Sequence, residues 1–181
     1  MLWRITHLNE TKLRAKLSIE YLSKCDIFLK ASMVMAYYPT FYELAFIFEL
    51  INRFPTKKYY FPKIMGNNLI FYQATNPTNF ETHGRLKVFE PKAIGQSLEL
   101  KEDLAKVIAF IPSVGIDRKL NRLGQGKGFY DRFLTQSSSC LKTVSIIPDF
   151  ALFRGEMPVD GWDRKLKSAL VVGLNEVEFI D

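Results

Sequence analysis

The chain contains only two cysteines and two histidines among 181 residues, and these shortages limit the chemistry available to it. Cys25 and Cys140 lie far apart, without neighbours at metal-ligand spacing, which predicts neither a disulfide framework nor a zinc site. Catalysis by a serine or cysteine nucleophile requires a histidine base, and His7 and His83 fall in a predicted N-terminal arm and in a polar loop. We therefore expect chemistry that does not depend on histidine.

Long apolar runs are also absent. The longest stretches, such as residues 107–111, are far shorter than the roughly 18 to 20 residues that a transmembrane helix needs. Arg4, His7 and Glu10 interrupt the apolar residues near the N-terminus, which argues against a signal-peptide core. From these two observations we expect a cytoplasmic protein. The length allows one sizeable core and is short for two, so we expect a single domain over residues 1–181.

Positive charge is in excess but is not concentrated. The net charge of +6 and the pI near 9.3 would suit nucleic acid, a membrane surface or a polyanionic small ligand. Lysine and arginine are scattered along the chain, without an RNA-binding aromatic signature or a basic amphipathic stripe. We expect a monomer that binds a phosphate-rich small molecule and neither nucleic acid nor a membrane.

The most informative segment is residues 122–131, which contains glycine at three alternate positions. Glycines permit backbone angles closed to other residues and let main-chain N–H groups approach a ligand closely. Arg122 and Lys127 add positive charge, and a helix beginning near Gly128 would direct its positive dipole end the same way. The segment predicts a phosphate cradle. The alternative is a strand-to-helix turn with solvated charges.

Two common phosphate loops do not fit this segment. A Walker loop would need glycine at Asn121 and serine or threonine at Gly128, and a dinucleotide fingerprint would need glycine at Phe129. Phosphoryl transfer more generally requires a phosphate cradle, positioned cations and a metal ion. Asp131, just beyond the cradle, is a candidate magnesium ligand. Its alternative role is an acidic residue in the first turn of a helix.

Strands and helices alternate along the chain. Apolar patterns predict strands at residues 32–38, 59–61, 69–72, 107–111, 143–147 and 169–173. Asn9 caps a predicted helix that carries Arg14, and Thr40 and Glu43 have capping-box spacing before a second helix, so Glu43 has either this capping role or a ligand contact. The order predicts a parallel α/β sheet covered on both faces, with ligands beyond the carboxyl ends of its strands.

The sequence Arg122-Leu-Gly-Gln-Gly-Lys-Gly-Phe-Tyr-Asp-Arg-Phe-Leu, preceded by Ile111-Pro112-Ser-Val-Gly-Ile-Asp117, closely resembles the signature of the 5-formyltetrahydrofolate cyclo-ligase family. Members are also called 5,10-methenyltetrahydrofolate synthetases. Weaker correspondences extend the resemblance over about residues 12 to 167. They are Leu13-Arg14, the strand that ends at Pro39 before Glu43, Phe61-Pro62, Glu90-Pro91, and Pro158 followed by Asp163.

The resemblance implies a three-layer α/β/α sandwich with a mainly parallel, Rossmann-like sheet. It also implies a ring closure that depends on ATP and magnesium. In that family the formyl oxygen on folate N5 is phosphorylated, N10 attacks the activated carbon, and loss of phosphate leaves 5,10-methenyltetrahydrofolate. A phosphate ester of the formyl oxygen supplies a leaving group without any histidine, so the enzyme chiefly has to align the reacting groups.

Site residues follow from the same resemblance. Implied to bind ATP are Lys12, Arg14, Arg122, Gly124, Gly126, Lys127, Gly128 and Tyr130, with Arg122 and Lys127 as the catalytic cations and with packing as the alternative role of Tyr130. Implied to border the folate are Glu43, Gln125, Gly126 and Phe129. Implied to hold magnesium are Asp131 and Asp163.

The chain departs from the family pattern mainly on the pterin side. The segment Glu43-Leu-Ala-Phe46 lacks the second acid and the hydroxyl that the family often has there, and Phe129 replaces a tyrosine. Glu10 stands where a lysine is expected, and Trp162 where a histidine is expected. These departures motivate an alternative hypothesis, a folate- or nucleotide-binding homologue with weak or altered catalysis.

Overall fold

The computed structural model describes residues 8–40, 43–83, 88–93, 96–98, 104–137 and 139–181. His7 lies outside these residues, as do Phe41 and Tyr42 inside the predicted capping box. The side chain of His83 also lies outside the description.

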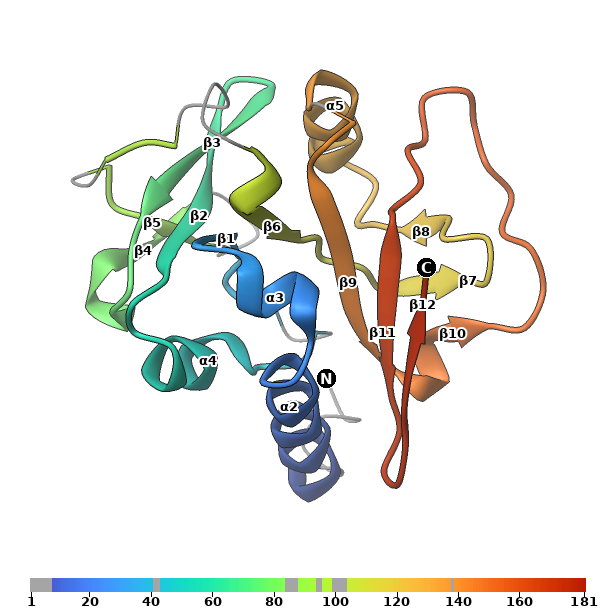
Figure 1. Ribbon diagram of the computed structural model, residues 1–181. Helices are drawn as coiled ribbons and strands as arrows, with labels where there is room; N and C mark the ends of the chain where they lie inside the picture. The colour runs from blue at the N-terminus through green and yellow to red at the C-terminus, as the bar shows by residue number, and fades with distance from the viewer. Residues whose placement is uncertain (1–7, 41–42, 84–87, 94–95, 99–103, 138) are drawn as a thin grey trace.

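A seven-stranded sheet with the order β12-β11-β9-β6-β1-β2-β3 forms the centre of the fold (Figure 1). Its inner strands are parallel to one another: β11 (Ser168–Val172), β9 (Lys142–Pro148), β6 (Val107–Phe110), β1 (Met33–Met35) and β2 (Lys58–Met65). Both edges are antiparallel, β12 (Val177–Ile180) on one side and β3 (Asn68–Gln73) on the other. The prediction of a mainly parallel sheet is confirmed.

Helices cover both faces of this sheet. Buried side chains of α2 (Leu8–Leu22), α3 (Asp26–Lys30) and α4 (Ile47–Arg53) pack in one core with Ile108 and Phe110 of β6. Val107 and Ala109, which alternate with them, face a second core that includes Phe133 of α5 (Phe129–Gln136). Side chains on a strand point to opposite faces in turn, so a continuous apolar strand supplies both cores. This is the predicted three-layer α/β/α arrangement.

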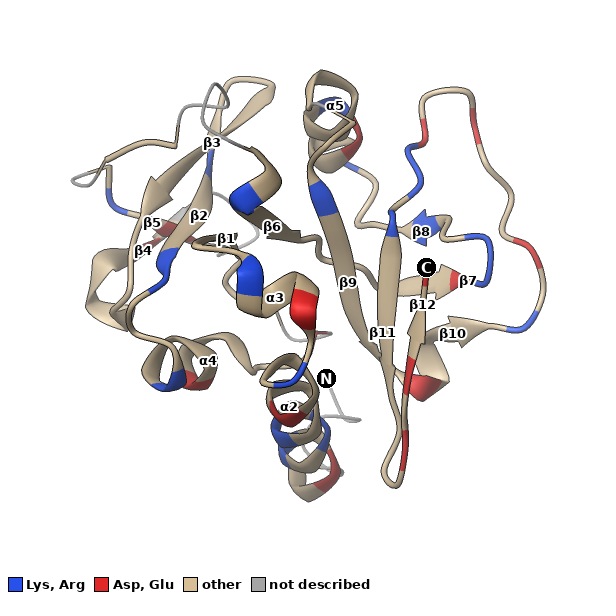
Figure 2. Cartoon of the chain, viewed as in Figure 1, with Lys and Arg blue, Asp and Glu red and all other residues tan. Residues whose placement is uncertain are grey.

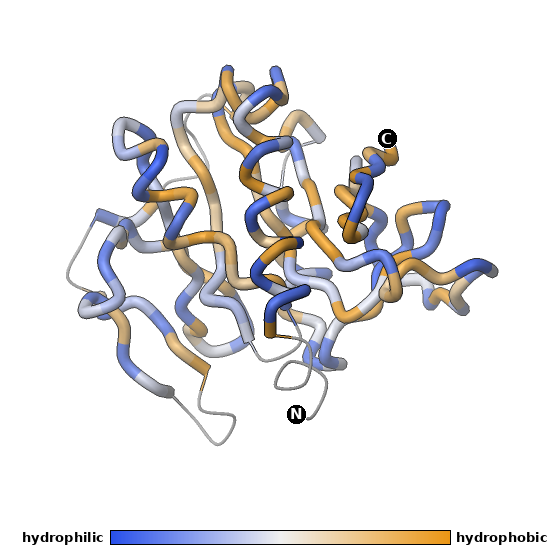
Figure 3. Tube along the Cα trace, turned by 90° about the horizontal axis from the view of Figure 1, so that it is seen from below, coloured by the Kyte–Doolittle hydropathy of each residue, from blue (hydrophilic) through white to orange (hydrophobic). Residues whose placement is uncertain are grey.

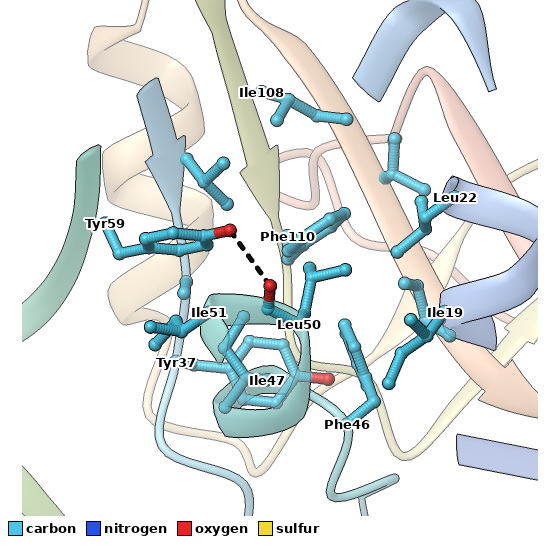
Figure 4. Close-up of a cluster of buried hydrophobic side chains, with 14 of the residues drawn as sticks. Ile19, Leu22, Tyr37, Phe46, Ile47, Leu50, Ile51, Tyr59, Ile108 and Phe110 are labelled. Carbon is cyan, nitrogen blue, oxygen red and sulfur yellow. Dashed lines mark hydrogen bonds between the residues drawn. The ribbon is translucent and has the colours of Figure 1, made fainter. Parts of the chain in front are cut away.

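The core beneath α2 and α4 is closely packed. Figure 4 shows Ile19 and Leu22 of α2 converging with Leu50 and Phe110, all of them buried. Tyr59 is fully buried in this core, and its hydroxyl donates a hydrogen bond to the backbone oxygen of Leu50 over 3.3 Å. Along the helices, hydrophobic and hydrophilic residues alternate in the manner of one-sided burial (Figure 3).

Two small sheets and three short helices complete the described chain. A three-stranded sheet joins β10 (Leu152–Phe153), β7 (Gly115–Asp117) and β8 (Arg122–Leu123). A hairpin pairs β4 (Phe80–His83) with β5 (Val88–Pro91). The 3-10 helices are η1 (Pro77–Asn79), η2 (Leu104–Lys106) and η3 (Asp149–Ala151).

The helix expected after Thr40 begins later than predicted. Glu43 accepts hydrogen bonds from the Thr40 backbone nitrogen at 2.6 Å and from its Oγ1 at 2.8 Å, so the capping contact exists. Residues 43–46 are nevertheless not helical, and α4 starts at Ile47. Burial of Leu44 and Phe46 in the core explains this late start, because it draws the segment before α4 against the sheet.

Charged residues are distributed over helices, strands and loops (Figure 2). None of the helices within the described ranges combines the length and apolar character needed to cross a bilayer.

Candidate functional site

A cavity of about 410 Å³ opens beyond the carboxyl ends of β1 and β6. Tyr37 and Tyr38 follow β1 into its wall, and Pro112 and Ser113 follow β6. The glycine segment 122–131 lines it along its whole length. This is the position predicted for a ligand crevice in a parallel sheet.

The glycines shape the loop that borders this cavity. Gly126 and Gly128 have φ angles of +75° and +65°, in the left-handed region that other residues rarely adopt, and Gly128 is the N-cap of α5. At Gly124 an added Cβ would lie only 3.1 Å from Nη1 of Arg122. The absence of side chains therefore sets both the course of the loop and the position of this guanidinium.

Arg122 is the buried cation of the site. Only 5% of its side chain is exposed, and its Nη2 donates to Oδ1 of Asp131 over 2.6 Å. Its guanidinium also lies 5.8 Å from the ring centre of Tyr130. Among the described residues no acceptor pairs with its Nε, although that nitrogen is buried. A buried donor without a partner favours an anionic ligand, and a phosphate group fits this donor.

Lys127, Gln125 and Phe129 also line the cavity, and the backbone around them is braced by Arg132. Arg132 donates to the Lys127 oxygen at 3.1 Å and to the Asn67 oxygen at 2.8 Å, and its guanidinium lies 4.9 Å from the Phe129 ring centre. The sequence analysis did not single out Arg132. Its place directly after Asp131 in the family signature was the available signal.

Asp131 and Asp163 both line the cavity, as a magnesium site formed by the two would require. The backbone nitrogen of Arg164 lies 3.4 Å from Oδ1 of Asp131, so the loop that carries Asp163 approaches the start of α5. No group of three metal-ligating side chains occurs within the described part of the chain. Mg²⁺ commonly uses one or two carboxylates together with water and phosphate oxygens, so these two acids fit it.

A second cavity of about 550 Å³ adjoins the first. The two share the loop residues 126–128 and both aspartates, and the second continues past Thr135 to Trp162. A ligand held at the glycine loop therefore has room to extend in two directions.

Glu43, Tyr37 and Tyr130 lie together in the wall of the main cavity. Burial raises the pKa of Tyr37 well above its ordinary value, and the charge of Glu43 raises it further. Burial and the same carboxylate also raise the pKa of Tyr130, against the opposing charge of Arg122. Both hydroxyls therefore stay protonated at neutral pH. The sequence analysis had not identified Tyr37, whose apolar neighbours mark it only as part of a strand.

Lys12 and Arg14 do not line either cavity. Lys12 is exposed on α2. Arg14 is buried, and its guanidinium donates to Asp149 at 2.9 Å, to the Val172 oxygen at 3.2 Å and to Glu10 at 3.2 Å. Glu10, in place of the lysine expected there, thus forms an ion pair with Arg14 one turn away. The ATP contacts of Lys12 and Arg14 stay predictions.

Part of the cavity wall is apolar. Ile64, Leu69, Val88 and Phe89 line it, and the Phe89 ring stacks on that of Tyr38 at 4.5 Å between centres. Glu90 of β5 also lines the cavity. The cavity therefore combines a cationic, N–H-rich loop with apolar and aromatic walls.

A model of the 5-formyltetrahydrofolate cyclo-ligase family matches residues 6–172. The chain belongs to this family. A probable 5-formyltetrahydrofolate cyclo-ligase of Schizosaccharomyces pombe is 30% identical over 122 residues, which cover 61% of this chain and 59% of the relative. A 5-formyltetrahydrofolate cyclo-ligase of Mycoplasma pneumoniae is 30% identical over 129 residues, which cover 70% and 62%. The chain thus spans about three-fifths of the length of these curated relatives.

Solved structures of family members share the fold. A 5,10-methenyltetrahydrofolate synthetase of Aquifex aeolicus matches 95% of this chain and 83% of its own, with a TM-score of 0.73 and 24% identity. The Mycoplasma pneumoniae synthetase matches 91% and 87%, with a TM-score of 0.65 and 21% identity. The central sheet and its covering helices are therefore the architecture of the cyclo-ligase family.

Proposed function

We propose that this protein is an ATP- and magnesium-dependent cyclo-ligase that converts 5-formyltetrahydrofolate to 5,10-methenyltetrahydrofolate. The observation that carries the proposal is the buried Arg122, whose Nε lacks a partner among the described residues. It lies beside a glycine loop in a cavity that also has aromatic walls. Membership of the cyclo-ligase family supports the choice of substrate.

The reaction requires activation of a poor electrophile. The formyl oxygen attacks the γ-phosphorus of ATP, the bond from phosphorus to the ADP oxygen breaks, and ADP leaves. N10 then attacks the formyl carbon, the carbon–oxygen bond breaks with release of inorganic phosphate, and N10 loses its proton to solvent. Alignment and charge stabilisation supply most of the catalysis in such a sequence, which fits a site without an identified histidine base.

Four charged residues of the site have roles in this proposal. Arg122 and Lys127, with the backbone N–H groups of residues 124–128, bind the phosphates and stabilise charge on the transferring group. Asp131 and Asp163 would hold magnesium, which neutralises phosphate charge when bound. The second cavity offers room for the remainder of the nucleotide.

A direct assay tests the proposal. Purified protein is mixed with 5-formyltetrahydrofolate, ATP and magnesium, and formation of the methenyl chromophore is followed by absorbance. We expect product that requires both ATP and magnesium, with samples lacking ATP or containing EDTA as controls. Absence of product from protein shown by circular dichroism to be folded would refute the function.

A second candidate is a homologue that binds folate or nucleotide with weak turnover. Phe46 supports it, because this residue stands where the family often has a hydroxyl and is 1% exposed within the core. Tight binding of 5-formyltetrahydrofolate without product in the same assay would favour this candidate. We also propose a cytoplasmic monomer with no nucleic-acid partner, and light scattering after gel filtration tests its oligomeric state.

A further inference from the structure

Glu90 is a buried acid in which one of the two carboxylate oxygens has no hydrogen-bond partner among the described residues. It lies on β5 and is 2% exposed. Its Oε1 accepts a hydrogen bond from the backbone nitrogen of Ile64 over 3.3 Å, which joins β5 to β2. Its Oε2 is buried, and among the described residues no donor reaches it. Most buried polar atoms in proteins have a partner, so this oxygen requires an explanation.

The neighbouring cation, Lys63, does not donate a hydrogen bond to this oxygen. Lys63 precedes Ile64 on β2, but its ammonium group donates to Glu81 Oε1 at 3.1 Å and to the Pro91 oxygen at 3.3 Å. Glu81 is the strand partner of Glu90 across the β4–β5 hairpin. Exposed Glu81 therefore forms the ion pair with Lys63, whereas buried Glu90 lines the cavity.

The surroundings of Glu90 define the ligand group that would fit. Ile64, Val88 and Phe89 provide apolar walls, and the stacked rings of Tyr38 and Phe89 provide an aromatic one. A flat heteroaromatic ring fits such walls, and a buried carboxylate oxygen within them selects a ring that carries N–H donors. Phosphate groups are excluded here by charge and are suited to the glycine loop.

We propose that Glu90 determines substrate specificity by accepting, through Oε2, a hydrogen bond from the 2-amino pyrimidine edge of the pterin ring. The inference rests on the proposed function, since it takes the substrate to be a reduced folate. It assigns the pterin to the part of the cavity wall formed by β2 and β5 and leaves the glycine loop for the phosphates. Glu90 is then a binding residue that accepts a hydrogen bond from the substrate and takes no part in phosphoryl transfer.

The substitution Glu90→Gln separates this role from a structural one. Glutamine keeps an acceptor for the Ile64 backbone nitrogen, whereas its amide nitrogen would present a donor to the ligand's donor. Glu81→Gln is the matched control, because it changes the paired acid of the same hairpin outside the cavity. The thermal midpoint of each variant reports whether the hairpin is intact.

The experiment measures the binding of two ligands to the wild type and to each variant. Titration calorimetry without ATP measures the binding of 5-formyltetrahydrofolate and of an analogue that lacks the exocyclic 2-amino group. We expect wild type and Glu81→Gln to bind the analogue at least about tenfold more weakly than the substrate, and Glu90→Gln to bind both equally weakly. In turnover, KM for the folate should rise about tenfold or more in Glu90→Gln, with KM for ATP unchanged.

Each outcome decides between the hypotheses. Equal affinity of the wild type for the two ligands overturns the contact even if Glu90→Gln does not fold. An unchanged folate KM in a folded Glu90→Gln also overturns it and leaves the cyclo-ligase function standing. Substrate binding that depends on the 2-amino group without any turnover refutes the proposed reaction and supports the contact. Failure of the wild type to bind the folate overturns both.

Discussion

Arg122 and Asp131 form an ion pair of 2.6 Å in which the arginine side chain is 5% exposed and the aspartate 24%. The pair ties β8, where the glycine segment begins, to the first turn of α5. Asp131 therefore has a structural role in addition to its proposed role as a magnesium ligand. Asp163 is exposed and accepts a hydrogen bond from the Asp160 backbone nitrogen over 2.8 Å, so it has the proposed metal role without this structural one.

Substitution of the two acids should separate these roles. We expect Asp131→Ala to lower the free energy of unfolding by about 2–3 kcal/mol, because the buried Arg122 loses its charged partner. Asp163→Ala should change it by about 0.5 kcal/mol or less. Urea denaturation measures both values. Each variant should also need more magnesium for half-maximal activity, and equal losses of stability would contradict the assignment.

Lys127 should matter for activity and little for stability, because it is exposed on the loop and lines both cavities. Lys127→Ala should reduce turnover about 100-fold or more, the usual cost of removing a preorganised charge that stabilises the transition state. Its urea midpoint should match that of the wild type. Lys165→Ala is the control, an exposed lysine outside both cavities. Unaltered steady-state kinetics in Lys127→Ala would rule out the phosphate contact.

Gly128 should be intolerant of a side chain. Its φ of +65° costs a residue with a Cβ about 1–2 kcal/mol, and the added atom would also lie 2.9 Å from Nη1 of Arg132. We expect Gly128→Ala to lower the unfolding free energy by that amount, measured by thermal denaturation. Gly155, with no positive φ and nothing within 4 Å of an added Cβ, is the matched position. Similar losses in both variants would contradict this account.

Arg14 should contribute mainly to stability. Its buried guanidinium joins α2 to Asp149 and to the Val172 oxygen at the end of β11. Arg14→Met should lower the free energy of unfolding by about 3 kcal/mol, because Asp149 and the Val172 oxygen would lose their donor. Lys12→Met, on the exposed side of the same helix, should cost little. KM for ATP, measured in both variants, tests the predicted nucleotide contacts independently of stability.

The features that the sequence predicts are those encoded over a few neighbouring residues. The apolar run 107–111 could only be buried, and the glycine spacing of 122–131 could only suit a tight loop. The hairpin that carries Glu90 lies in the stretch around His83 that the sequence predicts as a polar loop, because its strands are short, polar and close to a proline. The pairing of Arg14 with Asp149 joins residues 135 positions apart, and no local pattern encodes such a contact.

Asp117 joins Met157, in the cavity wall, to the turn that precedes Arg122. It is completely buried at the end of β7. Its Oδ1 accepts from the backbone nitrogens of Lys119 and Asn121, and its Oδ2 accepts from Asn121 Nδ2 and from the Met157 nitrogen. Burial acts to raise the pKa of Asp117, but the hydrogen bonds from Met157, Asn121 and Lys119 outweigh it, so that the pKa lies below its ordinary value.

This lowered pKa makes part of the stability depend on pH. A carboxyl group whose pKa is lower in the folded state stabilises the fold above its unfolded pKa, about 3.9, and loses that contribution as the pH falls through the folded pKa. Asp117→Asn should therefore cost about 2–4 kcal/mol at pH 7, because its amide would face two donors, and the difference from wild type should shrink below about pH 4. Urea denaturation across this range measures it, with exposed Asp26→Asn as the control. A difference that is the same at pH 7 and pH 3 would show that the ionised carboxylate is not what holds this wall together.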